Sequence, residues 1–189
     1  TGSLPGPKVE DWRFTPLRNL AKIPFQPALA AGSVDSIPSS VPVISGAARL
    51  VLVNGFYSKH LSSKDLGKGV EVSQGKVAPK QGSSLVALNA AYAPASLALR
   101  VTEAAKKIIH IVSISIGAAD GQPSAMHPRI TVTAESGSSV TLIESHVGLR
   151  GETYFSNPVA SISVGDGASV RRYVSVDEDS GAYHLATSL

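Results

Sequence analysis

The five histidines are the residues of this chain with the widest range of chemistry, because imidazole can bind a metal ion, transfer a proton or form hydrogen bonds. They are His60, His110, His127, His146 and His184. His127 and His146 could lie on neighbouring turns of a repeating structure and together hold a metal ion or a cluster. Metal sites usually have closer spacing, such as HxxxH, or cysteine and carboxylate ligands on the same element. A separation of nineteen positions between the two residues of this pair specifies no site, so we expect each histidine to be held singly by backbone carbonyls.

The acidic run Asp177-Glu178-Asp179 could bind calcium or serve as an acid–base pair. Adjacent strand residues point to opposite faces, so at most Asp177 and Asp179 would share one, and we predict a solvated turn. Residues 173–178 (YVSVDE) also resemble the strand that ends in Asp-Glu in ATPases. The upstream segment 69–76 (GVEVSQGK) has five residues between its glycines instead of four, and Val77 follows where a hydroxyl must reach magnesium. These departures exclude nucleotide binding.

The chain contains no cysteine, which excludes disulfides, thiolate nucleophiles and cysteine-ligated zinc or cluster sites within it. It also lacks the GxSxG elbow of serine hydrolases. We therefore predict no catalytic residue, no cofactor-binding residue and no metal ligand in this chain.

Two pairs of large side chains have both a functional and a structural interpretation. Arg171 and Arg172 could bind an anion, but one of two adjacent strand residues should point into the fold or toward a neighbour. The default for both is a solvated guanidinium on an aliphatic stem that packs along the sheet. Trp12 and Phe14 could dock a partner, but we expect them to pack the opening turns onto the body of the protein.

An internal repeat indicates the elements that position these residues. Residues 132–145 (VTAESGSSVTLIES) align with residues 162–175 (ISVGDGASVRRYVS) at an offset of thirty positions. Each copy has a β-branched strand, a glycine turn and a second β-branched strand, which predicts a coiled β-architecture whose turns stack. One coil cannot bury its apolar face alone, so we expect further coils beyond Leu189. The last coil here would then present an open edge through which the chain self-associates.

The composition agrees with stacked strands. Hydrophobic residues make up 43% of the chain but aromatic residues only 5%, so the core must consist of Val, Ile, Leu and Ala. The net charge of +3 is scattered, which excludes a nucleic-acid partner. The apolar stretch 108–119 is interrupted by polar residues and is shorter than the roughly 20 residues of a membrane helix, so we expect no membrane partner.

The sequence divides into three segments. Residues 1–48 form an N-terminal helical segment and connector, with a helical turn on either side of Pro16 and a flexible connector over 28–47. Residues 49–97 contain a hairpin, a loop over 58–83 and a short helix over 85–92 (LVALNAAY). Asn54-Gly55 between apolar runs predicts the hairpin, because both residue types tolerate positive φ. Residues 98–189 begin a parallel β-helix core.

In this third segment we predict strands that are joined by glycine-centred turns. The strands cover residues 98–101, 108–116, 130–134, 140–144, 159–164, 170–176 and 183–186. The turns contain Gly121, Gly137, Gly148, Gly151, Gly165 and Gly167.

Seven short motifs occur in a fixed order along nearly the whole chain. They are residues 10–18 (EDWRFTPLR), 51–57 (VLVNGFY) with Leu61-Ser62, 87–91 (ALNAA), His127-Pro128-Arg129, Glu144-Ser145, 154–157 (YFSN) and 182–185 (AYHL). Together they resemble the SufB/SufD family of scaffold proteins of the SUF iron–sulfur cluster assembly system, its SufD members in particular. The resemblance covers the amino-terminal half of a typical member, and we transfer no functional residue from the family.

The resemblance implies a mainly β fold, with a small helical N-terminal region followed by a right-handed parallel β-helix that is incomplete here. It implies a non-catalytic scaffold subunit that partners a SufC-like ABC-type ATPase and a cysteine-bearing, SufB-like paralogue. An iron–sulfur cluster would be carried by the assembled complex, with no cofactor in this chain. The implied compartment is the bacterial cytoplasm, or the plastid stroma if the source is a plant or alga.

A parallel β-helix polysaccharide lyase or hydrolase is the alternative function. Such enzymes gather carboxylates with Arg or Lys on one sheet face and use aromatic platforms for sugars. The strand region has few acidic residues and no aromatic stripe, which argues against this alternative.

Overall fold

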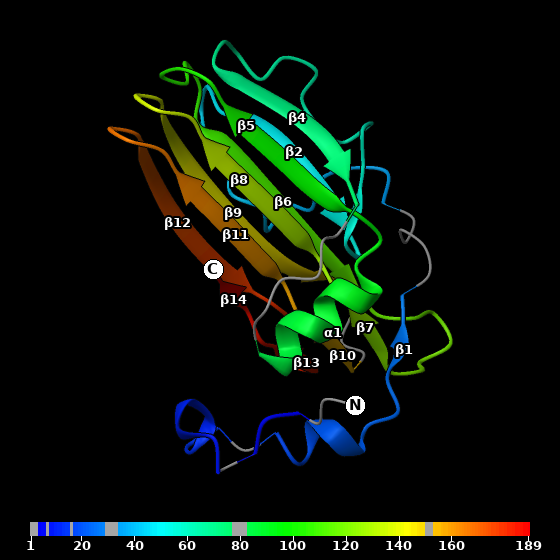
Figure 1. Cartoon of the computed structure of the whole chain (residues 1–189). Coiled ribbons are helices and arrows are strands. Elements are labelled where there is room, and N and C mark those ends of the chain that lie inside the picture. Colours follow the sequence, from blue (N-terminus) through cyan, green and yellow to red (C-terminus); the bar gives the residue numbers. More distant parts are fainter. Residues whose placement is uncertain (1–3, 7, 16, 29–33, 77–82, 150–152) are drawn as a thin grey trace.

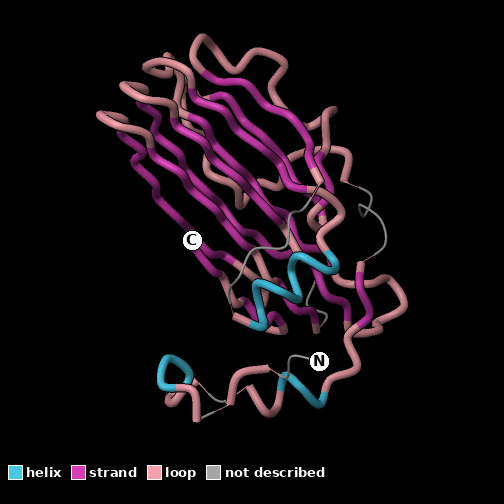
Figure 2. Tube along the Cα trace, in the orientation of Figure 1, coloured by secondary structure: helices cyan, strands magenta, loops and turns pink. Residues whose placement is uncertain are grey.

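The computed structural model describes residues 4–6, 8–15, 17–28, 34–76, 83–149 and 153–189 (Figure 1). These residues form a mainly β structure of three sheets in which most neighbouring strands are parallel (Figures 1 and 2). From residue 124 onward the chain visits the three sheets in rotation, as successive coils. This confirms the predicted β class and is consistent with an incomplete β-helix.

From β7 onward each sheet takes one strand from each coil, whereas the antiparallel pairs β2–β3 and β4–β5 each lie within one sheet. Sheet A has the order β1 (Gln26–Pro27), β7 (Ser124–Met126), β10 (Tyr154–Ser156) and β13 (Ala182–His184). Sheet B has the order β12 (Ser169–Asp177), β9 (Ser139–Leu149), β6 (Ile109–Ile116), β2 (Ala48–Val53) and β3 (Phe56–Tyr57). Sheet C has the order β14 (Thr187–Ser188), β11 (Val159–Val164), β8 (Arg129–Ala134), β5 (Ser96–Val101) and β4 (Val70–Gly75).

The sequence repeat matches the strand register. Ile162 on β11 pairs with Val132 on β8, and Ser169 on β12 pairs with Ser139 on β9. Both pairs are thirty residues apart, so the repeat length is the length of one coil. Gly137 and Gly167 occupy the equivalent turn in the two coils with φ of +74° and +68°, a conformation that glycine adopts without strain.

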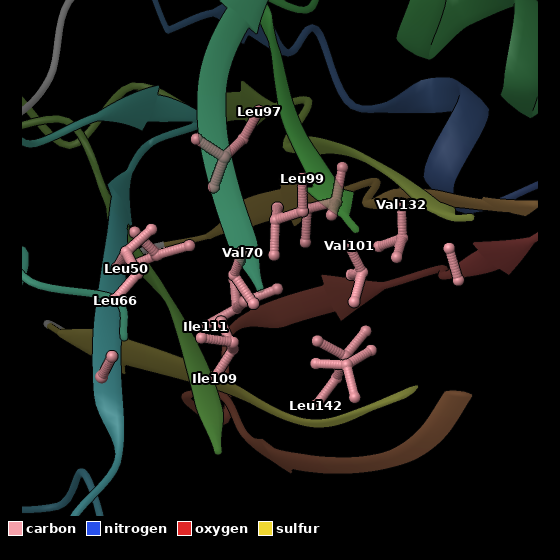
Figure 3. Close-up of a cluster of buried hydrophobic side chains, with 14 of the residues drawn as sticks. Leu50, Leu66, Val70, Leu97, Leu99, Val101, Ile109, Ile111, Val132 and Leu142 are labelled. Atoms are coloured by element: carbon pink, nitrogen blue, oxygen red, sulfur yellow. The ribbon is translucent and has the colours of Figure 1, made fainter. Parts of the chain in front are cut away.

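The main core lies between sheets B and C. Leu142 and Ile111 of sheet B belong to the same buried cluster as Leu99 and Val132 of sheet C (Figure 3). The cluster consists of Val, Ile, Leu and Ala, as the composition predicts. A second cluster forms where Val34, Ile37, Val41 and Leu61 pack against the other face of sheet B. The prediction of a flexible connector is therefore wrong for Val41, although the described residues 34–47 form no helix or strand.

The hairpin and the short helix are confirmed. β2 pairs antiparallel with β3 through Asn54 and Gly55, which have φ of +50° and +86°. Helix α1 spans Ser84–Tyr92, and the Ser83 hydroxyl accepts a hydrogen bond from the backbone N–H of Val86 at 3.5 Å. α1 lies at the end of the molecule where β7, β10 and β13 run (Figure 1).

The predicted helical N-terminal region is not present as such. In its described part the structure has two three-residue 3-10 turns, η1 (Glu10–Trp12) and η2 (Leu20–Lys22), and neither has a side-chain cap. Segments this short cannot offset the cost of helix nucleation, so packing of Leu17 and Leu20 fixes this region instead. Pro16 lies outside the described residues.

Two further predictions in the β region are wrong, and four short strands were not predicted. β4 forms within residues 58–83, which were predicted to be a loop, because Val70 and Val72 alternate inward and the strand pairs with β5. Gly148 lies inside β9 and not in a turn, and Gly151 falls outside the described residues. β1, β7, β10 and β14 span only two or three residues each, which is too short for a recognisable sequence pattern.

No helix in the described residues is both long and apolar enough to span a membrane.

Candidate functional site

The strongest concentration of buried ionisable groups lies where the inward face of β9 changes from apolar to polar. Leu142 belongs to the main core, and the two-residue period of a strand puts Glu144 and His146 on the same face. Both are only 2% exposed. We call the following residues the His–Glu cluster: Glu144, His146, Tyr154, Arg172, Glu178 and His184.

Glu144 and Arg172 form a bidentate ion pair between adjacent coils. Arg172 Nε lies 2.7 Å from Glu144 Oε1, and Nη2 lies 2.8 Å from Oε2. Burial alone would raise the pKa of Glu144, but hydrogen bonds from Arg172 and His146 hold it below its usual value. The hydrogen bond to Glu144 in turn raises the pKa of Arg172. The Glu144 carboxylate is therefore ionised, and the positive charge of Arg172 compensates its negative charge.

Glu178 is the second buried carboxylate, with a side chain only 5% exposed. Tyr154 donates its hydroxyl to Glu178 Oε2 at 2.5 Å, His184 Nδ1 lies 3.1 Å from Oε1, and Ser115 Oγ lies 3.4 Å from Oε1. Burial opposes ionisation, but the hydrogen bonds from His184 and Tyr154 keep the pKa of Glu178 below its usual value. Burial, together with the hydrogen bond to Glu178, raises the pKa of Tyr154, so this phenol donates and stays neutral.

His146 and His184 meet edge to face with ring centroids 5.0 Å apart. His146 Nε2 lies 3.7 Å from Glu144 Oε2, and His184 Nδ1 faces Glu178. The opposite ring nitrogens, His146 Nδ1 and His184 Nε2, are buried and have no hydrogen-bond partner among the described residues. His146, Glu178 and His184 form the group of described residues that could hold a metal ion, with one potential ligand atom from each within 4.8 Å of the others.

Gly148 makes room for this arrangement. A Cβ atom at this position would collide with the Tyr154 hydroxyl and would lie 2.6 Å from the backbone nitrogen of Asp179. The Tyr154 hydroxyl also accepts a hydrogen bond from that same nitrogen at 3.2 Å. The glycine thus lets β9 approach the loop that carries Glu178.

A second buried polar network connects α1 to two turns, the one between β7 and β8 and the one between β10 and β11. The Asn89 side chain, fully buried, donates to the carbonyls of Pro128 and Asn157 at 2.9 and 2.8 Å. Its oxygen accepts a hydrogen bond from Arg129 at 2.9 Å. Asn157 Nδ2 donates to the carbonyl of Leu85 at 3.0 Å. These bonds join α1 to the equivalent turn of two successive coils. The network therefore holds the helix in place, and its role is structural.

The structure does not bring together His127 and His146, the pair considered from sequence. His127 stacks on Tyr92 at 5.6 Å and lies 3.3 Å from Asn157 Nδ2, whereas His146 meets His184. Burial lowers the pKa of His127 to about 4, so this histidine is neutral. The expected backbone carbonyl partner is found for His60, whose Nε2 lies 3.2 Å from the oxygen of Val34. His110 instead pairs with the Ser145 hydroxyl at 2.9 Å.

Three other interpretations are decided by burial. The predicted solvated turn is wrong for Asp177 and Glu178: Asp177 is exposed but ends strand β12, and Glu178 lies in the following loop but its side chain is buried. Arg171 is exposed while Arg172 binds Glu144, so one member of the pair does point to a neighbour. Trp12 packs against the cluster of Leu17 and Leu20, whereas Phe14 is 87% exposed and the packing prediction is wrong for it.

Sequence reasoning missed the grouping of His146, Glu178 and His184, and also Tyr154 as a partner of Glu178. The residues come from β9, the loop after β12 and the end of β13. No local motif links them, because the path of the coil sets their proximity. The thirty-residue repeat was the available signal, since it placed Val176 beside His146 and thus Glu178 two residues from that position.

Comparisons with known proteins agree with the coil geometry. Residues 115–189 match the family model described as SUF system FeS cluster assembly, SufBD core domain. An iron–sulfur cluster assembly SufBD family protein of Synechocystis sp. is 27% identical, with 98% of this chain and 46% of that protein covered. The iron–sulfur cluster assembly protein SufD of Escherichia coli is 26% identical, with 97% of this chain and 45% of that protein covered.

The chain thus spans about half the length of these relatives. The motif order along the chain, the coil of thirty residues and the core-domain match all point to one family. Residues 115–189 match the core domain of the SufBD family of SUF iron–sulfur cluster assembly proteins, and nearly the whole chain is similar to proteins of that family.

Proposed function

We propose that the chain is part of a non-catalytic scaffold subunit of the SUF complex, and that its three sheets are the first coils of a right-handed parallel β-helix. The match of residues 115–189 to the SufBD core domain carries this proposal. The strand register supports it, since β10, β11 and β12 stack in parallel on β7, β8 and β9 with a common offset of thirty residues. Such a stack supplies a rigid rod on which other subunits can be arranged.

The chemistry of cluster assembly would then lie on partner subunits. The chain has no cysteine, so thiolate ligands for a nascent cluster would come from a cysteine-bearing, SufB-like paralogue. Energy would come from a SufC-like ABC-type ATPase. The cluster is the cargo of this assembly and not a resident cofactor of the chain. The assembly would work in the bacterial cytoplasm, or in the plastid stroma if the source is photosynthetic and eukaryotic.

Deletion of the gene in its native host tests this role. We expect the activity of enzymes that need a [4Fe–4S] cluster to fall, and the wild-type gene to restore it. Enzymes without a cluster serve as the control and should keep their activity. Unchanged cluster-enzyme activity under iron limitation and oxidative stress would refute the role in cluster assembly.

A further inference from the structure

We propose that His146, Glu178 and His184 form a binding site for a divalent first-row transition-metal ion such as Zn²⁺. The site would lie inside the coil, between sheets A and B. This inference rests on the geometry of the described residues and is independent of the proposed role in the SUF complex.

The donor set favours this class of ion. Two imidazoles and one carboxylate suit Zn²⁺ and its neighbours in the first transition row, whereas Mg²⁺ and Ca²⁺ prefer oxygen ligands alone. Zinc sites with three protein ligands commonly combine two histidines with one glutamate and keep a fourth position for water. The absence of cysteine from the chain does not count against such a site.

The spacing is close to what one ion requires. The three potential ligand atoms lie within 4.8 Å of one another. Ligand atoms about 2.0–2.2 Å from a tetrahedral zinc ion lie roughly 3.3–3.6 Å apart. Contraction of about an ångström, within reach of rotations about the side-chain bonds, would therefore complete the set.

The unpartnered ring nitrogens supply an independent indication. His146 Nδ1 and His184 Nε2 are buried and have no hydrogen-bond partner among the described residues. A buried polar atom without a partner costs free energy, and few such atoms occur in folded proteins. A metal ion bound through these two nitrogens would remove this cost, and the Glu178 carboxylate, which faces His184 Nδ1 at 3.1 Å, would have to turn from that nitrogen toward the ion.

The surrounding groups resemble the outer shell of a metal site. A carboxylate beside the opposite nitrogen of a metal-binding histidine fixes its tautomer and raises its basicity. Glu144 lies in this position, 3.7 Å from His146 Nε2, and forms an ion pair with Arg172. Tyr154 holds the Glu178 carboxylate at 2.5 Å. Two of the three ligands, His146 and Glu178, thus already have a neighbour that can orient them.

Cobalt(II) binding to the purified protein, prepared without a histidine tag, tests the proposal. We expect one equivalent of Co²⁺ to bind, to give the visible absorption of a low-coordinate cobalt centre and to be displaced by Zn²⁺. His146→Ala and Glu178→Gln should each weaken Zn²⁺ binding more than about 100-fold, beyond the ~10–100-fold cost of losing an outer-shell partner. Tyr154→Phe, which removes an outer-shell partner, should fall within that smaller range.

His60→Ala is the matched control, because it removes an exposed histidine outside the cluster, and it should leave affinity unchanged. Glu178→Gln preserves the shape of the side chain, and circular dichroism without metal reports whether each variant folds. X-ray absorption of the wild-type zinc complex should detect two imidazole ligands, whatever the variants do. Failure to bind one equivalent, retention of affinity in a folded Glu178→Gln variant, or a spectrum without imidazole scattering would overturn the proposal.

Discussion

Arg172 shows at the residue scale why charge inside the coil must be paired. Its guanidinium forms a bidentate ion pair with Glu144, whose side chain is 3% exposed. Loss of one member of a buried pair leaves a charge without compensation, which costs more than the pair itself contributes. This asymmetry leads to a specific expectation for the two adjacent arginines.

Arg172→Met should lower the free energy of unfolding by about 3 kcal/mol, the lower end of the range for buried pairs because the arginine is partly exposed. Arg171→Met, one residue away on the exposed face, should change it by less than about 0.5 kcal/mol. The double variant Arg172→Met/Glu144→Leu should recover most of the loss, since two apolar side chains can replace a buried pair. Urea unfolding measures all three. Equal losses in Arg171→Met and Arg172→Met would contradict this account.

His127 should make stability depend on pH. Its pKa is about 4 in the folded chain and about 6.5 when unfolded, so the unfolded state binds more protons between these values. The contribution of His127 to the free energy of unfolding should therefore be constant above about pH 6.5 and fall as the pH drops toward 4. Between pH 7.5 and pH 5 this residue should account for a loss of about 2 kcal/mol. His127→Gln should remove that share of the loss in urea unfolding at the two pH values. The same pH dependence in wild type and variant would show that His127 does not carry it.

At the scale of elements, α1 depends on one asparagine. Asn89→Ala removes two donors from the carbonyls of Pro128 and Asn157 and one acceptor from Arg129. Buried groups left without partners cost about 1–3 kcal/mol each, partly relieved by water, so we expect a loss of about 3 kcal/mol in thermal or urea unfolding. Asn19→Ala, at an exposed position beside η2 that makes no capping bond, is the control. A loss below about 1 kcal/mol for Asn89→Ala would mean that the network does not anchor the helix.

The elements that the sequence predicts best are those with strong local signals. The Asn54-Gly55 turn, α1 and the longer strands each have a complete pattern within a few residues. The repeat of thirty residues predicts even the pairing of β8 with β11 and of β9 with β12. β7 and β10 have three residues each, so their positions depend on the coil that they complete. The meeting of His146 with Glu178 and His184 depends on the same tertiary path, and composition and spacing do not contain it.

At the scale of the whole molecule, β12 forms one edge of sheet B. It pairs with β9 along one edge, and its other edge has no partner among the described residues. Tyr173 is 59% exposed and Val176 is 52% exposed on this strand. An unpaired edge with apolar side chains favours pairing with another strand.

The 189-residue chain prepared by itself should therefore self-associate, and its mean mass in light scattering should rise with concentration. Tyr173→Lys should reduce this association, because a lysine on an edge strand opposes pairing. Phe14→Lys, which changes an exposed aromatic residue away from β12, should leave the association as it is. A constant monomer mass over the concentration series would contradict the prediction.

The scaffold role is tested most directly by an anaerobic affinity pull-down of the intact gene product from its native host, with mass spectrometry of the captured proteins. We predict that an ABC-type ATPase and a cysteine-bearing paralogue are recovered in stoichiometric amounts with the tagged protein, and that neither is recovered with the tag alone. Recovery of the tagged protein without these two partners, from cells shown to express both, would contradict the scaffold assignment.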